Sequence, residues 1–548
     1  MPCDTNKDGR DISQRLLRRL VERSEVTTVS ETFAALETNS DRVNLALDLL
    51  KENAVFPQFL VDGKSSELSV EYRQKGNQAF KRKLSVEALE FYTKSILFSP
   101  GSSENLALAY ANRSAVLFEN RLYEECIADI NRALKSGYPE KLKAKIETRM
   151  EKAKSLKPAQ FKVEFCTPAP NISKEFENSR IQCASSAIAI KNSPSQGRHV
   201  VATRDIDPGE ILAVETPFCS FLVDDFYTNC HQCLKLCYNL VPCEWCTQAL
   251  FCSEECENLA LKYHAYECPI LKSLKSLRMG KLELLPMRIA LLVGDGVPNP
   301  VENDEVYRSD RYAEIHGLVS NTTSRTVADL FKRAVNAAVI YHLVENHSKF
   351  FILKSSNVRN VFKELVLLHM QTGPCNFHQI TQPCFGGDLT DKEIGAGAFS
   401  FLSLFNHSCS PNVSRYCHQT TIVIVAIDSI KTDEQCYDNY GFHHAVMKRS
   451  DRQSQLRSQY FFDCRCVACE QDFPLYEYLP VLRGSVQLSQ SDMKKLHKCD
   501  TREARRILNE TLPKIKTLGA EKPNKNLAEL QEVVKRCYSI FTTIKRPF

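Results

Sequence analysis

The sequence lacks the features that would assign it to a membrane, to secretion or to nucleic acid. No run of about 18 apolar residues occurs, so no segment is long enough for a transmembrane helix. The first residues, MPCDTNKDGRDISQRLLRR, have no apolar signal-peptide core, and we expect a protein of the nucleus and cytoplasm. The 71 basic and 66 acidic residues form no dominant basic block, which argues against a nucleic-acid partner.

Cysteine, by contrast, is abundant, with 23 residues concentrated at a few places. In a chain that is not expected to be secreted, spaced cysteines indicate metal ligands rather than disulfides. The segment 230–268 contains four closely spaced ligand pairs, which together fill two tetrahedral zinc sites. Since no coordination position is left open, both sites are expected to be structural. The ligands are Cys230, Cys233, Cys243, Cys246, Cys252, Cys256, His264 and Cys268, with Cys237 as a spare thiol.

The patterning predicts a multidomain α+β protein, because 548 residues are too many for one core. The stretch VATRDIDPGEILAVETPF predicts two short strands joined by a turn at Pro208-Gly209, and TIVIVAI at 421–427 predicts a buried strand. The expected segments are a helical leader at 1–69, repeat-like helices at 70–156, a linker at 157–180, a β-rich domain at 181–443 interrupted by the cysteine-rich segment 230–268 and a helical insert at 270–374, a second cysteine cluster at 460–470, and a helical region at 471–548.

In residues 70–156, small and aromatic residues recur in a pattern that resembles tetratricopeptide (TPR) repeats. Gly76 and Ala111 stand where paired helices approach, Tyr92 and Tyr123 fill the gaps, and proline closes each unit. A helix from Glu140 to about Leu156 is expected to cap the array, since one repeat cannot bury its apolar face alone. An ordinary helical bundle is the alternative.

The TPR resemblance implies a concave groove that binds peptides. In chaperone-binding arrays, basic and asparagine side chains clamp a C-terminal carboxylate through charge-assisted hydrogen bonds. Solvated surface charge explains the same residues in this sequence. The clamp candidates are Arg73, Asn77, Asn112, Lys141 and Lys145.

Further motifs flank the zinc segment in a fixed order. Before it stands Gln196-Gly197-Arg198-His199; after it come NHSCSPN at 406–412, DEQCYDNYG at 433–441 and a Cys-x-Cys-x2-Cys cluster at 464–469. These motifs and their order resemble those of the SET and MYND domain-containing protein family, in which a MYND zinc finger interrupts a SET domain. The resemblance implies interleaved zinc pairs: Cys230, Cys233, Cys252 and Cys256 for one ion, and Cys243, Cys246, His264 and Cys268 for the other.

The resemblance also implies a site for S-adenosylmethionine. Glycine at the first motif lets the backbone approach the cofactor closely. Three residues, His199, Gln435 and Cys436, depart from the family's usual pattern without removing a reacting group. The implied roles are cofactor binding by Gln196, Gly197, Arg198, Asn376, Asn406 and His407, stacking on adenine by Phe462, and cofactor contact with catalysis by Tyr440.

A third zinc site is implied in the same way. The post-SET cysteines Cys464, Cys466 and Cys469 leave one tetrahedral position open, and the family fills it with the cysteine of the NHSC motif, here Cys409. Such a site would tie the post-SET segment over the active site. Three zinc ions per chain are therefore expected.

The function implied is that of a S-adenosylmethionine-dependent protein-lysine N-methyltransferase, acting on histones or other proteins. The rival is a non-catalytic adaptor, in which the TPR array and the MYND finger recruit chaperones or transcriptional co-repressors. DNA binding through the finger is disfavoured, because Lys235 and Lys262 face several glutamates there and would neutralise phosphate poorly.

Overall fold

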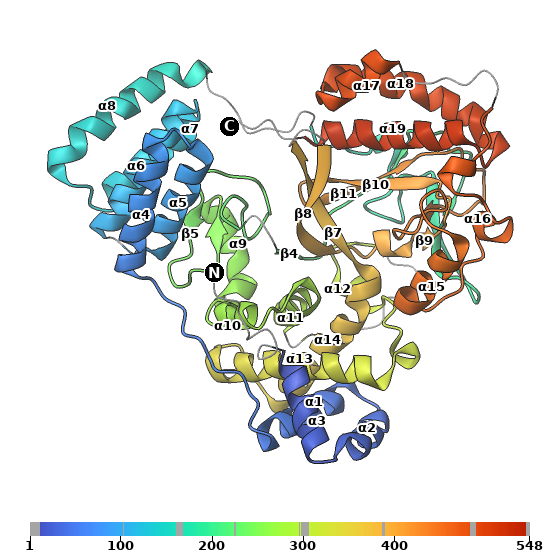
Figure 1. The fold of residues 1–548 in the computed structure, drawn as a ribbon, viewed down its shortest axis with the longest axis horizontal. Helices are drawn as coiled ribbons and strands as arrows, with labels where there is room; N and C mark the ends of the chain where they lie inside the picture. The colour runs from blue at the N-terminus through green and yellow to red at the C-terminus, as the bar shows by residue number, and fades with distance from the viewer. Residues whose placement is uncertain are drawn as a thin grey trace.

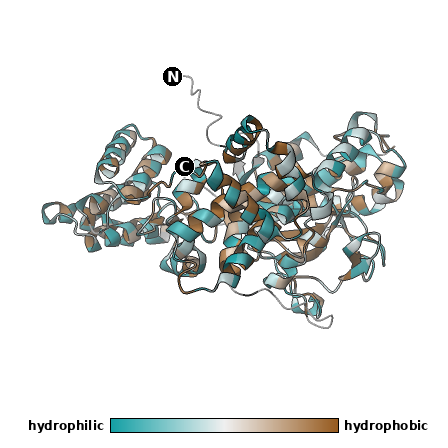
Figure 2. Cartoon of the chain, turned by 90° about the horizontal axis from the view of Figure 1, so that it is seen from below, coloured by the Kyte–Doolittle hydropathy of each residue, from teal (hydrophilic) through white to brown (hydrophobic). Residues whose placement is uncertain are grey.

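The computed structural model describes residues 11–101, 103–159, 168–223, 226–294, 296, 306–385, 389–482 and 489–543. It confirms a multidomain protein of helices and small β-sheets (Figure 1). Within this part of the chain, no helix combines the length and the apolar character required to cross a bilayer. Figure 2 shows apolar residues gathered where the helices of the main body pack, with hydrophilic residues along their outer faces.

Most of the small sheets contribute to one apolar core that includes Leu212, Phe401 and Ile424, whereas β5–β6 packs in the core of the finger. β9 and β12 run parallel, and the other named pairs are antiparallel. The sheets are β1–β2 (Ile188–Ser193 and Gly197–Ala202), β10–β11–β3 (Val413–His418, Thr421–Ala426 and Ile211–Glu215), β4–β8–β7 (Ser220–Leu222, Leu389–Ala398 and Phe377–Phe385), β9–β12 (Asn406–His407 and Tyr437–Asp438) and β5–β6 (Val241–Pro242 and Leu250–Phe251).

The two strands predicted around Pro208-Gly209 both form, but they do not pair with each other. β2 pairs with β1, whereas β3 pairs with β11 in another sheet. The turn is present, with Gly209 at a positive φ of 94°. The connection between β2 and β3 instead carries the chain from one sheet to the next, and an isolated bridge joins Ile206 to Ile430.

The helical leader packs onto the helical insert rather than standing apart. Asn39 donates to Glu364 at 2.8 Å, Lys363 donates to Asn44 at 2.6 Å, and Phe33 lies edge-on to Phe331. One apolar core therefore runs through leader, finger and insert. The leader helices are α1 (Ile12–Glu22), α2 (Val26–Ala34) and α3 (Asn39–Glu52); those of the finger and insert are α9 (Glu254–Glu267), α10 (Leu271–Ser276), α11 (Lys281–Val293), α12 (Tyr312–His316), α13 (Val327–His347) and α14 (Ser356–Asn376).

Five helices at the upper left of Figure 1 form the array at residues 66–156. A Cβ on Gly76 would stand 2.6 Å from the Tyr92 ring, so this close approach of α4 and α5 requires glycine. Lys64 joins array and finger, because its Nζ donates to the carbonyls of Leu97, Cys243 and Cys246. The helices are α4 (Ser66–Lys81), α5 (Ser85–Phe98), α6 (Glu104–Glu119), α7 (Tyr123–Lys135) and α8 (Glu140–Leu156).

The remaining helices follow the β-rich part. α15 (Arg449–Tyr460) and α16 (Val467–Glu470) carry the post-SET cysteines on and between them. The last three cover the β10–β11–β3 sheet, where Tyr416 stacks on Tyr538 with ring centroids 5.0 Å apart. They are α17 (Gln490–His497), α18 (Thr501–Leu518) and α19 (Lys525–Phe541). The predicted linker at 157–180 lies partly outside the described residues.

Candidate active site and metal centres

The structure groups the predicted metal ligands into three clusters. In each, the candidate ligand atoms lie within 4.8 Å of one another. Cys237 is in none of them; its thiol faces the Asn239 side chain at 3.1 Å. The clusters are Cys230, Cys233, Cys252 and Cys256; Cys243, Cys246, His264 and Cys268; and Cys409, Cys464, Cys466 and Cys469.

The spacing within each cluster fits tetrahedral zinc. Sulfur ligands about 2.3 Å from a zinc ion stand about 3.8 Å apart along a tetrahedron's edge. The observed Sγ–Sγ distances are 3.7 Å for Cys233–Cys252, 3.9 Å for Cys243–Cys268 and 3.6 Å for Cys409–Cys469. A disulfide would need about 2.05 Å. The chemistry and geometry of these donors therefore suit zinc and exclude disulfides between these pairs.

A buried charge network supports the second finger cluster. His264 turns Nε2 toward Cys246, 3.6 Å away, and Nδ1 toward the carboxylate of Glu267 at 3.3 Å. Glu267 also contacts His231 at 2.8 Å and Arg288 at 2.6 Å. Burial alone would raise the pKa of Glu267, but Arg288 holds that pKa well below its usual range. This carboxylate fixes the ring orientation of His264, a candidate metal ligand.

Arg288 joins this network to the β-rich domain. Its guanidinium is fully buried, and it donates to the Ser220 carbonyl in β4 at 2.6 Å. It also lies over the rings of Phe221 and Tyr263, at 4.6 and 4.0 Å. β4 in turn pairs with β8. The finger is thus anchored to the sheet by one buried arginine.

The first motif lies at the tight turn between β1 and β2. Gly197 begins β2 with φ of 64°, a left-handed conformation that favours glycine. Arg198 donates to the Gly317 carbonyl at 2.7 Å, and its side chain is one-third exposed. The Gln196 side chain accepts from Gln435, and its carbonyl accepts from Asn406 at 3.4 Å. Three distant motifs therefore meet at this turn.

Asn376, the last residue of α14, lies on another side of the site. Its Nδ2 donates to the carbonyls of Val319 at 2.8 Å and Thr372 at 2.9 Å. Its Oδ1 takes no hydrogen bond from the described residues, which leaves an acceptor for a donor on a bound molecule. Gly317 and Val319 belong to the same loop, so one loop holds both Arg198 and Asn376.

Asn406 and His407 form β9, which pairs with Tyr437 and Asp438 of β12. The His407 Nδ1 accepts from the Tyr440 backbone N–H at 3.1 Å, and Nε2 lies 3.4 Å from the Cys409 sulfur. Burial lowers the pKa of His407 to about 4, so the ring is neutral near pH 7. Because both ring nitrogens are engaged, a cofactor contact by His407 has to use its backbone or ring face.

Tyr440 lies at the centre of an aromatic group. Its hydroxyl donates to the Phe405 carbonyl at 2.8 Å, and burial raises its pKa above the usual range, so the hydroxyl stays protonated. Its ring centroid lies 5.2 Å from His407 and 4.7 Å from Tyr460. Phe462 lies 6.2 Å from His407. The structure thus brings both the candidate catalytic tyrosine and the candidate adenine-stacking residue next to the His407 ring.

Two parts of this site were absent from the sequence predictions. Tyr460 stands two residues before Phe462, and its place in an aromatic run beside the cysteine cluster was an available signal. The loop at 317–325 had no such signal, since it lies within the segment predicted as a helical insert. Only the fold brings its carbonyls to Arg198 and Asn376.

The clamp candidates lie on three helices of the array. Asn112 on α6 and Tyr92 on α5 both donate to the Asn77 side chain on α4, each at 2.9 Å. The Nε of Arg73 is buried without a hydrogen-bond partner. Lys141 and Lys145 on α8 are exposed. Asn77 is therefore already bound within the array, whereas Arg73 keeps an unused donor.

Comparison with known proteins adds sequence relationships to this geometry. The SET domain family model matches residues 197–441. A human relative, protein-lysine N-methyltransferase SMYD4, is 29% identical over 81% of this chain and 72% of its own length. The Danio rerio protein of the same name is 27% identical over 75% and 66%, respectively. Histone-lysine N-methyltransferase ASHR1 of Arabidopsis thaliana is 26% identical over 52% and 55%.

A solved structure, the SET domain of LSMT bound to lysine and AdoHcy, is 9% identical and covers 65% of this chain and 85% of that one. Its TM-score of 0.24 is too low to support an argument about this fold. The family model and the long sequence matches carry the relationship. They agree with the order of motifs, in which metal ligands separate Gly197 from the NHSC motif. The chain thus contains a SET domain and is similar over most of its length to relatives of the SET and MYND type.

Proposed function

We propose that this protein is a S-adenosylmethionine-dependent protein-lysine N-methyltransferase. The main support is a chain of contacts between distant parts of the sequence: the Gln196–Arg198 turn contacts β9, β9 contacts Tyr440, and one loop contacts both Arg198 and Asn376. Relatives named protein-lysine and histone-lysine N-methyltransferases match most or half of the chain. Histones and other proteins that carry accessible lysines are the proposed substrates.

The residues present fit a cofactor with a cationic amino-acid end and an aromatic base. Asn376 offers Oδ1 to an ammonium group, Gln196, Gly197 and Arg198 offer backbone and side-chain donors, and Asn406 adds an amide at the same turn. Phe462 and the backbone of His407 would hold the adenine. When bound, S-adenosylmethionine would supply an electrophilic methyl group.

The chain's own task is to align a lysine amine and to keep it unprotonated. A lysine amine near its usual pKa of about 10.4 must lose its proton, and transfer into an apolar aromatic channel favours the neutral form. Tyr440 and Tyr460 would supply aromatic surface for such a channel, with their rings packed against each other at a centroid distance of 4.7 Å. The Phe405 carbonyl and the Tyr440 hydroxyl would orient the amine. No covalent intermediate with the protein is needed.

Three zinc ions would complete the protein, two in the MYND finger and one in the post-SET cluster. The third would shape the active site directly, because Cys409 follows His407 by two residues and Cys464 follows Phe462 by two. The Cys409 backbone N–H also points to the Cys466 sulfur at 3.3 Å. Arg452, fully buried, faces Cys469 at 3.7 Å and offsets thiolate charge.

The helical array would act as a TPR module that brings partners to the enzyme in the nucleus and cytoplasm. The buried unused Nε of Arg73 supports a clamp for a chaperone C-terminal peptide at Arg73, Asn77, Asn112, Lys141 and Lys145. Trp245, 74% exposed between Cys243 and Cys246, supports docking of a co-repressor there. The same features are what a non-catalytic adaptor would use.

Labelled-methyl transfer to a proteome or a peptide array tests the proposed activity. The wild type should label lysines, and Tyr440→Phe should lower the rate by about a hundredfold while retaining cofactor affinity, since a positioned hydroxyl acts mainly in the transition state. Calorimetry with S-adenosylmethionine provides the second measurement. Absence of binding by the wild type at high micromolar concentration would favour the adaptor.

A further inference from the structure

A loop from Gly317 to Arg325 holds two of the proposed cofactor residues by its backbone carbonyls. The carbonyl of Gly317 accepts from Arg198, and that of Val319 accepts from Asn376. The next carbonyl, that of Ser320, accepts from Nε of Arg325 at 3.0 Å. Arg325 therefore anchors the loop directly beside the carbonyl that Asn376 uses.

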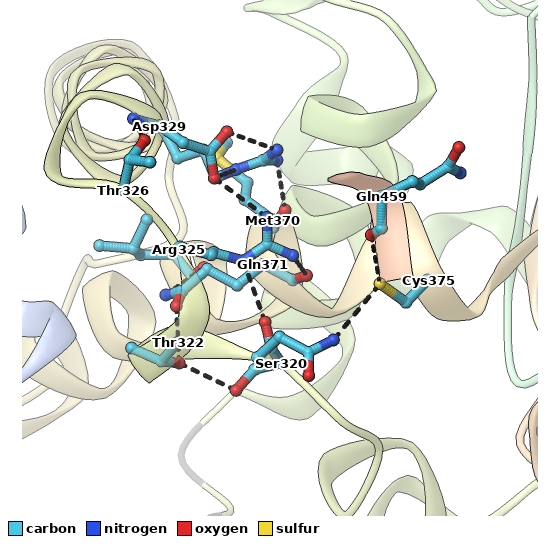
Figure 3. Close-up of polar contacts among 12 residues, drawn as sticks. Ser320, Thr322, Arg325, Thr326, Asp329, Met370, Gln371, Cys375 and Gln459 are labelled. Carbon is cyan, nitrogen blue, oxygen red and sulfur yellow. Dashed lines mark hydrogen bonds and ion pairs between the residues drawn. The ribbon is translucent and has the colours of Figure 1, made fainter. Parts of the chain in front are cut away.

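Arg325 also binds the helix that carries Asn376. One terminal nitrogen donates to the Gln371 carbonyl of α14 at 2.6 Å, and the other pairs with Asp329 at 3.0 Å (Figure 3). The arginine side chain is only 3% exposed. Figure 3 shows the guanidinium between the loop residues Ser320 and Thr322 and the end of α14. A buried, fully engaged fork of this kind fixes distances between backbone segments.

A third contact reaches the post-SET segment. The guanidinium carbon of Arg325 lies 5.1 Å from the centroid of the Phe461 ring, within range of a cation–π contact. Phe461 ends α15 in the left-handed conformation with φ of 63°, uncommon for a bulky residue, and Phe462 follows it. A second bridge runs in parallel, because Cys375 beside Asn376 contacts both the Asn321 side chain and the Gln459 carbonyl.

We propose that Arg325 is a positioning residue for cofactor binding, an inference that rests on the proposed methyltransferase function. It ties the loop behind Arg198 and Asn376 to the segment that presents Phe462. The residues for the amino-acid end of the cofactor and the residue for its adenine are thereby held at a fixed separation. Arg325 acts through these residues.

Arg333, on the helix α13 that follows Arg325, offers a matched control. It shares Asp329 at 2.9 Å and donates to the Met370 carbonyl of α14 at 2.7 Å. Pro374 has no N–H for Met370, so this contact also stabilises the end of α14. Its described contacts include neither the 317–325 loop nor Phe461. Substitution of Arg333 therefore removes a similar ion pair with Asp329 and a similar bond to α14. It leaves intact the link that Arg325 makes between the 317–325 loop and Phe461.

Calorimetry with S-adenosylhomocysteine on the full zinc-loaded chain tests this role. Arg325→Ala should raise the Kd about tenfold, because the charge-assisted bonds to Ser320, Gln371 and Asp329 and an aromatic contact are lost. Arg325→Lys should recover only part of the affinity, since one ammonium cannot reach all three partners. Arg333→Ala should lower the Tm similarly, with a Kd within about twofold of wild type. The KM for a peptide substrate should remain near the wild-type value in all three.

Equal effects of Arg325→Ala and Arg333→Ala on the Kd would overturn the inference. If either alanine variant fails to fold, Arg325→Lys and Arg333→Lys decide, and equal Kd values for these two would overturn it as well. Absence of binding by the wild type would instead reject the proposed function. The Arg325→Ala effect should also shrink in a Phe461→Leu background, and full additivity would exclude coupling through that ring.

Discussion

The candidate zinc finger at 230–268 and the candidate cofactor site are built in different ways. The finger draws all its ligands from one short segment, and Cys-x2-Cys and His-x3-Cys spacings place each pair on one side of a turn or helix. The cofactor site joins Gln196, Asn376, Asn406 and Phe462, which lie far apart in the sequence. Local geometry suffices for the finger, whereas the cofactor site depends on loops and strands that hold distant motifs together.

The largest difference in cofactor affinity is expected between two cysteine substitutions, one beside the candidate cofactor site and one in the finger. Cys409→Ser should remove one zinc and weaken S-adenosylhomocysteine binding by about tenfold or more, because the post-SET segment loses its anchor beside His407 and Phe462. Cys252→Ser should also remove one zinc, but leave the Kd within about threefold of wild type. Metal analysis and calorimetry measure both. Similar losses of affinity would show that the finger controls the cofactor site after all.

Glu267→Gln tests how strongly the finger is tied to the sheet. The change leaves Arg288 buried with an uncompensated charge and should destabilise the protein by about 3–5 kcal/mol. It should also lower zinc affinity at the His264 cluster by about tenfold or more. Denaturant unfolding and zinc competition with a chelator measure the two effects. Glu255→Gln, at an exposed position of α9, is the control and should change neither.

Glu215→Gln is expected to have a smaller effect, a pH-dependent change in the free energy of unfolding at the candidate cofactor site. Glu215 is fully buried and accepts the backbone N–H groups of Phe401 and Leu402, which lead to Asn406. Burial raises the pKa of Glu215 to about 8, although these N–H groups act in the opposite direction. The folded protein therefore holds this proton more tightly than the unfolded chain does, and wild-type stability falls as pH rises from about 4.5 to about 8.

Glutamine does not titrate, so the stability of the Glu215→Gln variant should not show this decrease as pH rises. At pH 5 it should be less stable than wild type by about 1 kcal/mol, because its amide nitrogen faces a backbone N–H. The difference in stability between wild type and variant should shrink as the pH approaches 8. Urea unfolding at both pH values measures the difference. If the stability difference instead increases with pH, Glu215 is ionised in the folded protein.

Some features could be predicted from neighbouring residues alone. The ligand pairs within 230–268, the helical array and its last helix at Glu140–Leu156, and the buried strand near 421–427 follow from local spacing or periodicity. The grouping of those pairs and the place of Cys409 beside the later cysteines came from the family resemblance instead. The two strands flanking Pro208-Gly209 were also predicted, but their partners β1 and β11 had no local signal, since strand partners depend on the whole sheet. The packing of the leader on α13 and α14 likewise had no local signal.

The sequence by itself determined the ligands, the motifs and their order, because metal geometry and helix periodicity act over a few residues. Only the tertiary structure decided which groups support them. Arg288 reaches Glu267 from another helix, the 317–325 loop places two carbonyls at Arg198 and Asn376, and Arg325 spans that loop, α14 and Phe461. These contacts join residues far apart in the chain, and burial makes each of them depend on the packing of several elements at once.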